Sequence, residues 1–109
     1  MTESRFVAAV FHANKQEAQL EKICEPSLRD DEVLVRLTAT GVCHTDISVR
    51  DGSVELPAPF VLGHEGAGIV ERVGSHVSSV APGDPVVISF NFCGACANCR
   101  KGLSAYCRH

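Results

Sequence analysis

The chain has 109 residues, a formal net charge of −3 and 45% hydrophobic residues, which is enough for one domain with a modest core. This mild negative charge gives neither the basic face that nucleic-acid binding requires nor a polybasic patch for a membrane surface. No apolar run approaches the length of a membrane-spanning helix. We therefore expect no nucleic-acid partner and no membrane partner.

The first residues do not combine a basic start, a long apolar stretch and a small-residue cleavage site, which together mark a secretory leader. We therefore expect a cytoplasmic protein in which cysteines stay reduced. Six cysteines in such a compartment indicate metal ligands in preference to a disulfide framework.

The sequence predicts an all-β fold, because apolar runs rich in valine recur between turn residues. Residues 32–40 alternate in character, which is typical of a strand with one buried face. One short helix is expected at 45–50, with Thr45 or His44 as its N-cap and Gly52 at its end. The strands are predicted, in chain order, at residues 6–11, 19–24, 32–40, 68–73 and 85–90.

Four cysteines near the end of the chain have the spacing C-x2-C-x2-C-x7-C, and four thiolates so close together suit a closed tetrahedral zinc site. An iron–sulfur cluster can share the opening of this run, but its fourth cysteine follows sooner and precedes proline, whereas here Arg108 follows. Disulfides are a third alternative that a reducing compartment disfavours. The run therefore favours a structural zinc held by Cys93, Cys96, Cys99 and Cys107.

A second, incomplete metal site is indicated upstream by Cys43 and His64. Singly, each has a more ordinary interpretation, since a lone cysteine is usually a small buried apolar residue and a lone histidine is usually a satisfied or surface group. Together they make two thirds of a Cys₂His set, which leaves zinc one open position for water or substrate. The other candidates lack such company, so we interpret Cys24 as a core residue. We assign His12 and His76 to the surface and His109 to the chain end.

Four motifs, taken in order, carry a family resemblance. They are GVCHTD at 41–46, GHEGAGIV at 63–70, the stretch from VG to GD at 73–84, and the four-cysteine run. In this order they resemble the N-terminal half of zinc-containing medium-chain alcohol dehydrogenases. The residue sequence of the motifs most resembles the benzyl (aryl) alcohol dehydrogenase branch. The resemblance implies a GroES-like, partly open β-barrel with a short helix and a structural zinc lobe at 93–107. It also implies that residues 1–109 are an incomplete catalytic domain without the coenzyme-binding Rossmann domain.

Carried over residue by residue, the resemblance makes Cys43 and His64 ligands of a catalytic zinc. The hydroxyl of Thr45 would contact the substrate oxygen and pass the proton of the alcohol away. Zinc would act as a Lewis acid, so that hydride can leave the alcohol carbon for NAD or NADP. The implied reaction oxidises a primary alcohol to its aldehyde. The resemblance of the motif sequences to the aryl branch favours an aromatic alcohol.

The same resemblance gives three neighbouring residues supporting roles. Asp46 would orient His64, and Glu65 would lie near the metal and replace an outgoing ligand. His44 would face the coenzyme pyrophosphate, as a weaker and more pH-dependent charge than arginine. The full-length enzyme is expected to be a homo-oligomer acting on a small-molecule alcohol or aldehyde, whereas the 109 residues alone are expected to be inactive.

The chain departs from the family pattern in three respects. Ser48 stands where the liver-type enzymes carry a relay histidine, so the proton would leave Thr45 by another route. The third catalytic ligand, a cysteine expected beyond the structural lobe, is not among these residues. No dinucleotide fingerprint is present, because Glu71 stands where the third glycine after Gly66 and Gly68 would be.

Two other functions stay open at this point. The first is a stand-alone zinc-binding module that recognises a partner, although such a module has no use for Thr45 beside a thiolate and an imidazole. The second is a formaldehyde or polyol dehydrogenase of the same family. Sorbitol-type enzymes usually weaken the structural lobe, whereas this chain keeps all four cysteines.

Overall fold

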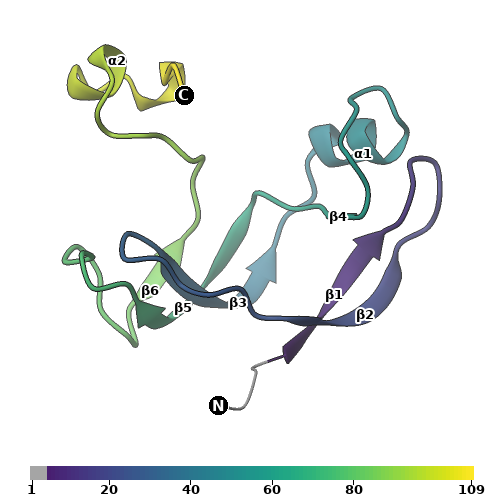
Figure 1. The fold of residues 1–109 in the computed structure, drawn as a ribbon, viewed down its shortest axis with the longest axis horizontal. Helices are drawn as coiled ribbons and strands as arrows, with labels where there is room; N and C mark the ends of the chain where they lie inside the picture. Colours follow the sequence, from purple (N-terminus) through teal and green to yellow (C-terminus); the bar gives the residue numbers. More distant parts are fainter. Residues whose placement is uncertain (1–4) are drawn as a thin grey trace.

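The computed structural model describes residues 5–109, which form two antiparallel sheets, two short helices and one 3-10 turn. One sheet has the strand order β2-β1-β4, and the other has the order β3-β5-β6 (Figure 1). The strands are β1 (Arg5–Phe11), β2 (Gln19–Cys24), β3 (Val33–Thr40), β4 (Phe60–Val61), β5 (Gly66–Val73) and β6 (Pro85–Val87). The remaining elements are the helices α1 (His44–Arg50) and α2 (Ala97–Arg100) and the 3-10 turn Ser104–Tyr106.

The predicted all-β fold is confirmed, and the differences lie at the ends of the strands. β5 begins at Gly66, earlier than predicted, because its ladder with β3 continues until Thr40 lies opposite Gly66. β6 ends at Val87 and does not reach Phe90 as predicted. The reason is that β5 offers no partner beyond Gly66, whose carbonyl oxygen accepts the last hydrogen bond of this pairing from Ile88.

The sequence pattern does not predict β4, α2 or the 3-10 turn. Each has two to four residues, which is too short to display a helical or an alternating period. The predicted helix is confirmed as α1, which begins at His44, one residue before the predicted start at Thr45. Its N-cap is Cys43, whose N–H donates to Oδ2 of Asp46 at 3.1 Å.

The pairing of β3 with β5 is the longest ladder in the described chain, and two register irregularities interrupt it. Gly68 permits the close approach of the two strands, because a Cβ atom there would lie 2.2 Å from the carbonyl oxygen of Arg36. The glycine at this position therefore follows from backbone packing and needs no separate functional explanation.

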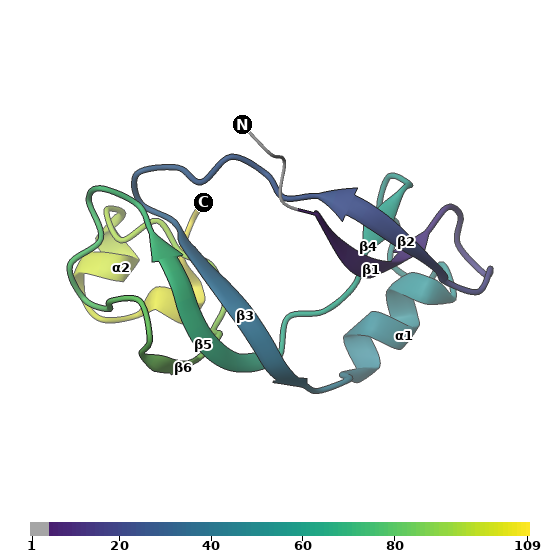
Figure 2. The same ribbon diagram turned by 90° about the horizontal axis from the view of Figure 1, so that it is seen from below.

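Few side chains are fully shielded from solvent, and the buried apolar residues of the described chain are Ala8, Val10, Val49 and Val70. Figure 2 shows the two sheets on either side of an open region. A cleft of about 720 Å³ lies there, lined by apolar side chains of both sheets that include Phe6, Val7, Leu34, Val35 and Ile88. The two sheets thus resemble two walls of a barrel whose interior is incompletely filled.

The prediction that Cys24 belongs to the core is wrong, because Cys24 is exposed. It ends β2, an edge strand that pairs with β1 in this sheet, so no further strand of the described chain covers its outer side. His12, His76 and His109 are exposed, as predicted. Nε2 of His12 also forms a hydrogen bond with the carboxylate of Glu21 at 2.9 Å, across the hairpin of β1 and β2.

Residues after β6 lead away from the sheets to a lobe that contains α2 and the 3-10 turn (Figure 1). We call residues 93–107 the cysteine lobe. α2 and the 3-10 turn pack on each other within it. None of the helices in the described range 5–109 is long and apolar enough to cross a membrane.

We predict that Gly68→Ala lowers the free energy of unfolding by at least about 2 kcal/mol more than Gly66→Ala. A methyl group at position 68 would meet rigid backbone at Arg36, whereas at position 66 it would meet the ends of the Leu37 and Ile88 side chains at 2.9 and 3.0 Å. Side-chain ends can move aside and paired backbone cannot. Urea denaturation of zinc-loaded protein measures both variants, and equal losses would contradict the proposed role of Gly68.

Candidate metal centres

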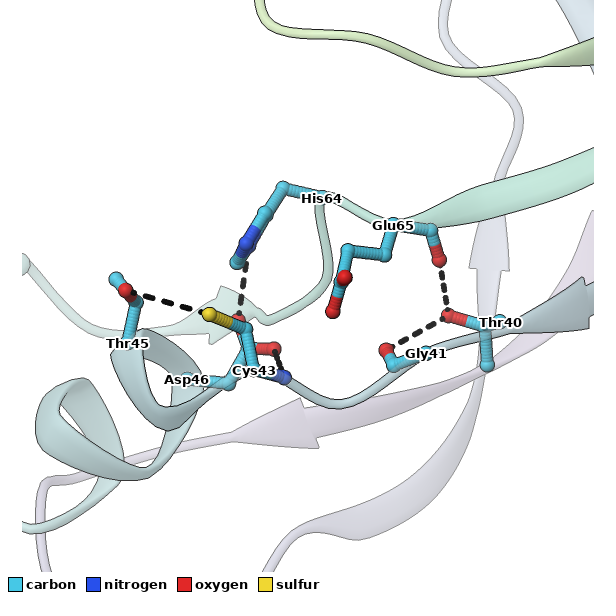
Figure 3. A network of polar contacts seen from close by, with 7 residues as sticks. All are labelled: Thr40, Gly41, Cys43, Thr45, Asp46, His64 and Glu65. Atoms are coloured by element: carbon cyan, nitrogen blue, oxygen red, sulfur yellow. Dashed lines mark hydrogen bonds and ion pairs between the residues drawn. The ribbon is translucent and has the colours of Figure 1, made fainter.

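The β3–β5 ladder brings the two upstream ligand candidates together. Its last pair is Thr40 opposite Gly66. Cys43 lies three residues after Thr40, and His64 lies two residues before Gly66, so both follow the same end of the ladder. Antiparallel neighbours continue side by side for a short distance beyond their last pair. Figure 3 shows the two side chains facing each other there.

Glu65 lies at the junction of these two segments. Its carbonyl oxygen accepts hydrogen bonds from the Thr40 hydroxyl at 2.7 Å and from the Gly41 N–H at 3.0 Å. Its carboxylate lies over Gly41, where a Cβ atom would be only 3.1 Å from Oε2. The backbone of Glu65 is therefore fixed, and its carboxylate points toward the space between Cys43 and His64 (Figure 3).

Cys43, His64 and Glu65 each offer one ligand atom, and these three atoms lie within 4.8 Å of one another. Zinc binds sulfur, nitrogen and oxygen ligands at about 2.0–2.3 Å, so atoms this close need only small shifts to share one ion. The sequence predicts Cys43 and His64 as ligands and Glu65 as a neighbour. In the structure, Glu65 is a third potential ligand.

Asp46 connects the two segments from its position on α1. One carboxylate oxygen lies 3.3 Å from Nδ1 of His64, and the other accepts the N–H of Cys43 at 3.1 Å. The contact with Nδ1 leaves Nε2 of His64 available to a metal. This is the geometry that an orienting carboxylate requires, and the role itself stays a prediction.

The environment lowers the pKa of Cys43 and raises the pKa of His64. The pKa of the Cys43 thiol is lowered first by the backbone N–H of Thr45, then by the Thr45 hydroxyl and by His64. The pKa of His64 is raised chiefly by its hydrogen bond with Cys43, and the charge of Asp46 adds to this. Zinc binds a thiolate and a neutral imidazole, so metal binding here would compete with protons for both groups.

Thr45 and His44 open α1, and both side chains are exposed. Oγ1 of Thr45 lies 3.6 Å from Sγ of Cys43, which places the hydroxyl at the edge of the candidate metal site (Figure 3). The roles predicted for these residues toward an alcohol and a coenzyme stay predictions.

The four sulfur atoms of the cysteine lobe form the second cluster. They all lie within 4.8 Å of one another, and Sγ of Cys93 is 3.9 Å from Sγ of Cys99. Backbone N–H groups surround them: Cys96 donates to Cys93 at 3.2 Å, and Cys93 donates to Cys107 at 3.3 Å. None of the cysteines forms a disulfide in the described chain. Four convergent sulfurs with N–H donors match the donor set of a closed zinc–thiolate site.

The pKa values of these thiols diverge because their surroundings differ. Backbone N–H groups of Arg108 and Cys99 lower the pKa of Cys96 to about 6. Those of Cys93 and His109 lower the pKa of Cys107. Burial, followed by the hydrogen bond with Cys96, raises the pKa of Cys99 to about 12. A dication among the four sulfurs would favour the thiolate at Cys99 as well, because it supplies the positive charge that the site otherwise lacks.

Residues 29–109 match the family model described as the alcohol dehydrogenase GroES-like domain. The chain belongs to this family. The resemblance read from the sequence motifs and the predicted GroES-like fold are thereby confirmed. The match includes all of the residues of both clusters, from Cys43 to Cys107.

Named relatives within the alcohol dehydrogenase family include the geraniol dehydrogenase of Castellaniella defragrans, which is 54% identical over 79 residues, 72% of this chain and 21% of the relative. The solved structure of an alcohol dehydrogenase zinc-binding domain protein from Burkholderia ambifaria has a TM-score of 0.93 and 48% identity, over 98% of this chain and 29% of that one. The benzyl alcohol dehydrogenase of Acinetobacter calcoaceticus has a TM-score of 0.92 and 43% identity, over 96% and 29%. This chain therefore spans between a fifth and a third of the length of these relatives.

One residue of this alcohol dehydrogenase domain was not anticipated at the site. The ring of Phe90 stacks on the imidazole of His64, with centroids 5.6 Å apart and planes at 21°. The sequence predicts Phe90 only as the end of a strand. A weak signal was available in the alternating apolar residues Ile88, Phe90 and Phe92, but their partner across the sequence could not be read from it.

We predict that the chain retains about one zinc after mild chelation, because only the cysteine lobe offers four ligands among the described residues. Cys99→Ser should lose this zinc and melt at a lower temperature, since an incomplete thiolate set no longer ties the lobe together. Cys24→Ser, at an exposed cysteine outside both clusters, is the control. Metal analysis and thermal melts decide, and iron in place of zinc, or unchanged zinc in Cys99→Ser, would contradict the assignment.

Proposed function

We propose that this chain is the zinc-binding N-terminal part of an NAD- or NADP-dependent dehydrogenase that oxidises a primary, aromatic alcohol to its aldehyde. The observation that carries the proposal is the convergence of Cys43, His64 and Glu65 beside the hydroxyl of Thr45. A stand-alone zinc module would need the cysteine lobe alone. A function as such a module would not explain why a thiol, an imidazole and a hydroxyl converge at one strand end.

In this proposal, Cys43 and His64 hold a catalytic zinc, and the cysteine lobe holds a structural one. When bound, the catalytic zinc supplies Lewis acidity that makes the alcohol hydroxyl easier to deprotonate. Asp46 keeps Nε2 of His64 directed at the ion by its contact with Nδ1. Glu65 is close enough to occupy a coordination position while substrate and product exchange.

The chain's own contribution to proton transfer is the Thr45 hydroxyl. It is exposed beside the cluster and can accept the hydrogen bond of an incoming alcohol. A hydroxyl held at hydrogen-bond distance can take up the substrate proton as it donates its own onward. Ser48 lies one turn further along α1, so water or the coenzyme ribose would receive the proton in place of a relay histidine.

We propose that residues 1–109 are an incomplete catalytic domain that further polypeptide covers in the whole enzyme. The chain exposes 8442 Å², whereas a folded monomer of its 11.6 kDa mass would expose about 5,800 Å². The excess includes large apolar side chains and coincides with the open cleft between the two sheets. The coenzyme domain is assigned to the same missing part, because the sequence holds no dinucleotide fingerprint.

Two features support an aromatic substrate. Phe90 lies against His64 and is 74% exposed, so its outer face is available to a second ring next to the metal position. Geraniol and benzyl alcohol, which name two of the relatives, are primary alcohols whose carbinol carbon adjoins an unsaturated group. Both alcohols thus present a flat π system where Phe90 could stack on it.

We predict that Thr45→Ala lowers kcat by about 100-fold or more in the enzyme that contains this chain, because general acid–base groups contribute about 10²–10⁴-fold. Thr45→Ser keeps a hydroxyl and should retain most of the activity. Both variants should keep the parent zinc content and melting temperature, since Thr45 is exposed. Coenzyme reduction followed by absorbance is the measurement, and a Thr45→Ala enzyme with parent kcat would remove Thr45 from the mechanism.

We also predict that Phe90→Ala lowers kcat/KM for benzyl alcohol about tenfold more than for ethanol, which presents no ring to stack. An aromatic contact contributes about 0.5–1.5 kcal/mol, and the upper end of this range corresponds to about tenfold. Phe92→Ala, at an exposed ring for which the structure gives no contact with His64, is the matched control. Equal losses for both alcohols would remove the aryl preference and leave the dehydrogenase assignment intact. The 109 residues alone, supplied with NAD and zinc, should reduce no coenzyme.

A further inference from the structure

The C-terminal end of α1 is held by the loop between β1 and β2. The last carbonyl groups of a helix have no partner within it and need donors from elsewhere. Here the side-chain amide of Asn14 donates to the carbonyl oxygen of Val49 at 2.7 Å. The backbone N–H of Lys15 donates to the carbonyl oxygen of Arg50 at 2.6 Å. The first hairpin therefore supplies two donors to the end of a helix that lies far from it in sequence.

The loop adopts an unfavourable conformation to make these contacts. Lys15 has φ +64°, in the left-handed region that residues with a Cβ atom seldom occupy. Such a conformation persists where surrounding contacts determine it. Gly52, just after the helix, also has a positive φ, and a Cβ there would lie 3.6 Å from Cβ of Asn14. The loop and the helix end are thus in close packing.

The position of this end influences the position of the other. α1 has seven residues, so at 1.5 Å per residue it is about 10 Å long and moves as one rigid unit. Its buried anchor is Val49, which is 5% exposed and is the residue whose carbonyl Asn14 contacts. Its opposite end carries Cys43 as N-cap and Thr45 in the first turn. A tilt about Val49 would displace both from His64.

We propose that Asn14 is a positioning residue. Its amide, together with the Lys15 N–H, fixes the orientation of α1 and thereby holds Cys43 and Thr45 in place opposite His64. The proposal rests on the proposed function, because a metal and an alcohol are what those residues serve. Asn14 itself touches neither reactant.

The test compares Asn14→Asp with the parent chain by titration with Co²⁺, after the cysteine lobe has been filled with zinc. Aspartate keeps the shape of asparagine but cannot donate, and its charge faces the negative end of the helix. We expect Co²⁺ binding at Cys43 and His64, followed by its visible absorption, to weaken about tenfold. The zinc content of the cysteine lobe should not change. Asn14→Gln, which keeps an amide donor, should recover part of the affinity.

His12→Ala is the matched control, because His12 lies in the same loop region and its ring hydrogen-bonds to the carboxylate of Glu21 on β2. It should bind Co²⁺ like the parent. If His12→Ala weakened binding as much as Asn14→Asp, or if Asn14→Asp bound Co²⁺ like the parent, the proposal would be overturned.

Backbone amide NMR shifts keep this test independent of the metal site. In the chain that carries zinc in the cysteine lobe and no metal at Cys43 and His64, Asn14→Asp should move the resonances of Cys43 and Thr45, whereas His12→Ala should leave them in place. If the parent chain does not bind Co²⁺ at this cluster, because the third cysteine ligand lies outside residues 1–109, the NMR result alone decides on Asn14. Unmoved resonances of Cys43 and Thr45 in Asn14→Asp would overturn the positioning role.

Discussion

The pairing of β3 with β5 is the constraint on which the candidate catalytic site depends. Cys43 belongs to one strand's continuation and His64 to the other's, and neither segment contains a full ligand set. The carbonyl oxygen of Glu65 accepts hydrogen bonds from the Thr40 hydroxyl and the Gly41 N–H, and these close the ladder at that end. Asp46 then connects α1 to His64. A loosened ladder would therefore separate the ligands without any ligand being changed.

The two candidate metal centres depend on the fold to different degrees. The cysteine lobe takes its four sulfurs from residues 93–107, and nearby backbone N–H groups surround them. Its order is local, so the metal itself can organise it. The cluster of Cys43, His64 and Glu65 joins segments about twenty residues apart, and the sheet must form before they meet. Loss of the first metal is expected to affect a lobe, whereas loss of sheet structure would remove the second site.

Sequence reasoning succeeded where spacing or a motif carried the information. The four cysteines are close in sequence, and the glycine-flanked motifs around Cys43 and His64 identify the family. It failed where the outcome depends on what pairs with what. Nothing local distinguishes Cys24 on an exposed edge strand from a buried cysteine, and the end of β6 depends on where β5 begins. The stacking of Phe90 on His64 likewise appears only when distant segments meet.

Gly41 has a consequence for how tightly a metal can be kept. The carboxylate of Glu65 folds over this glycine, and a side chain there would press on Oε2 from 3.1 Å away. If Glu65 binds the metal during exchange, as proposed above, the space over Gly41 would hold its carboxylate while it is not a ligand. Under that proposal, a substitution at Gly41 would change the residence time of the ion without changing any ligand. The rate of metal exchange could then be changed by substituting Gly41 alone, with every ligand left intact.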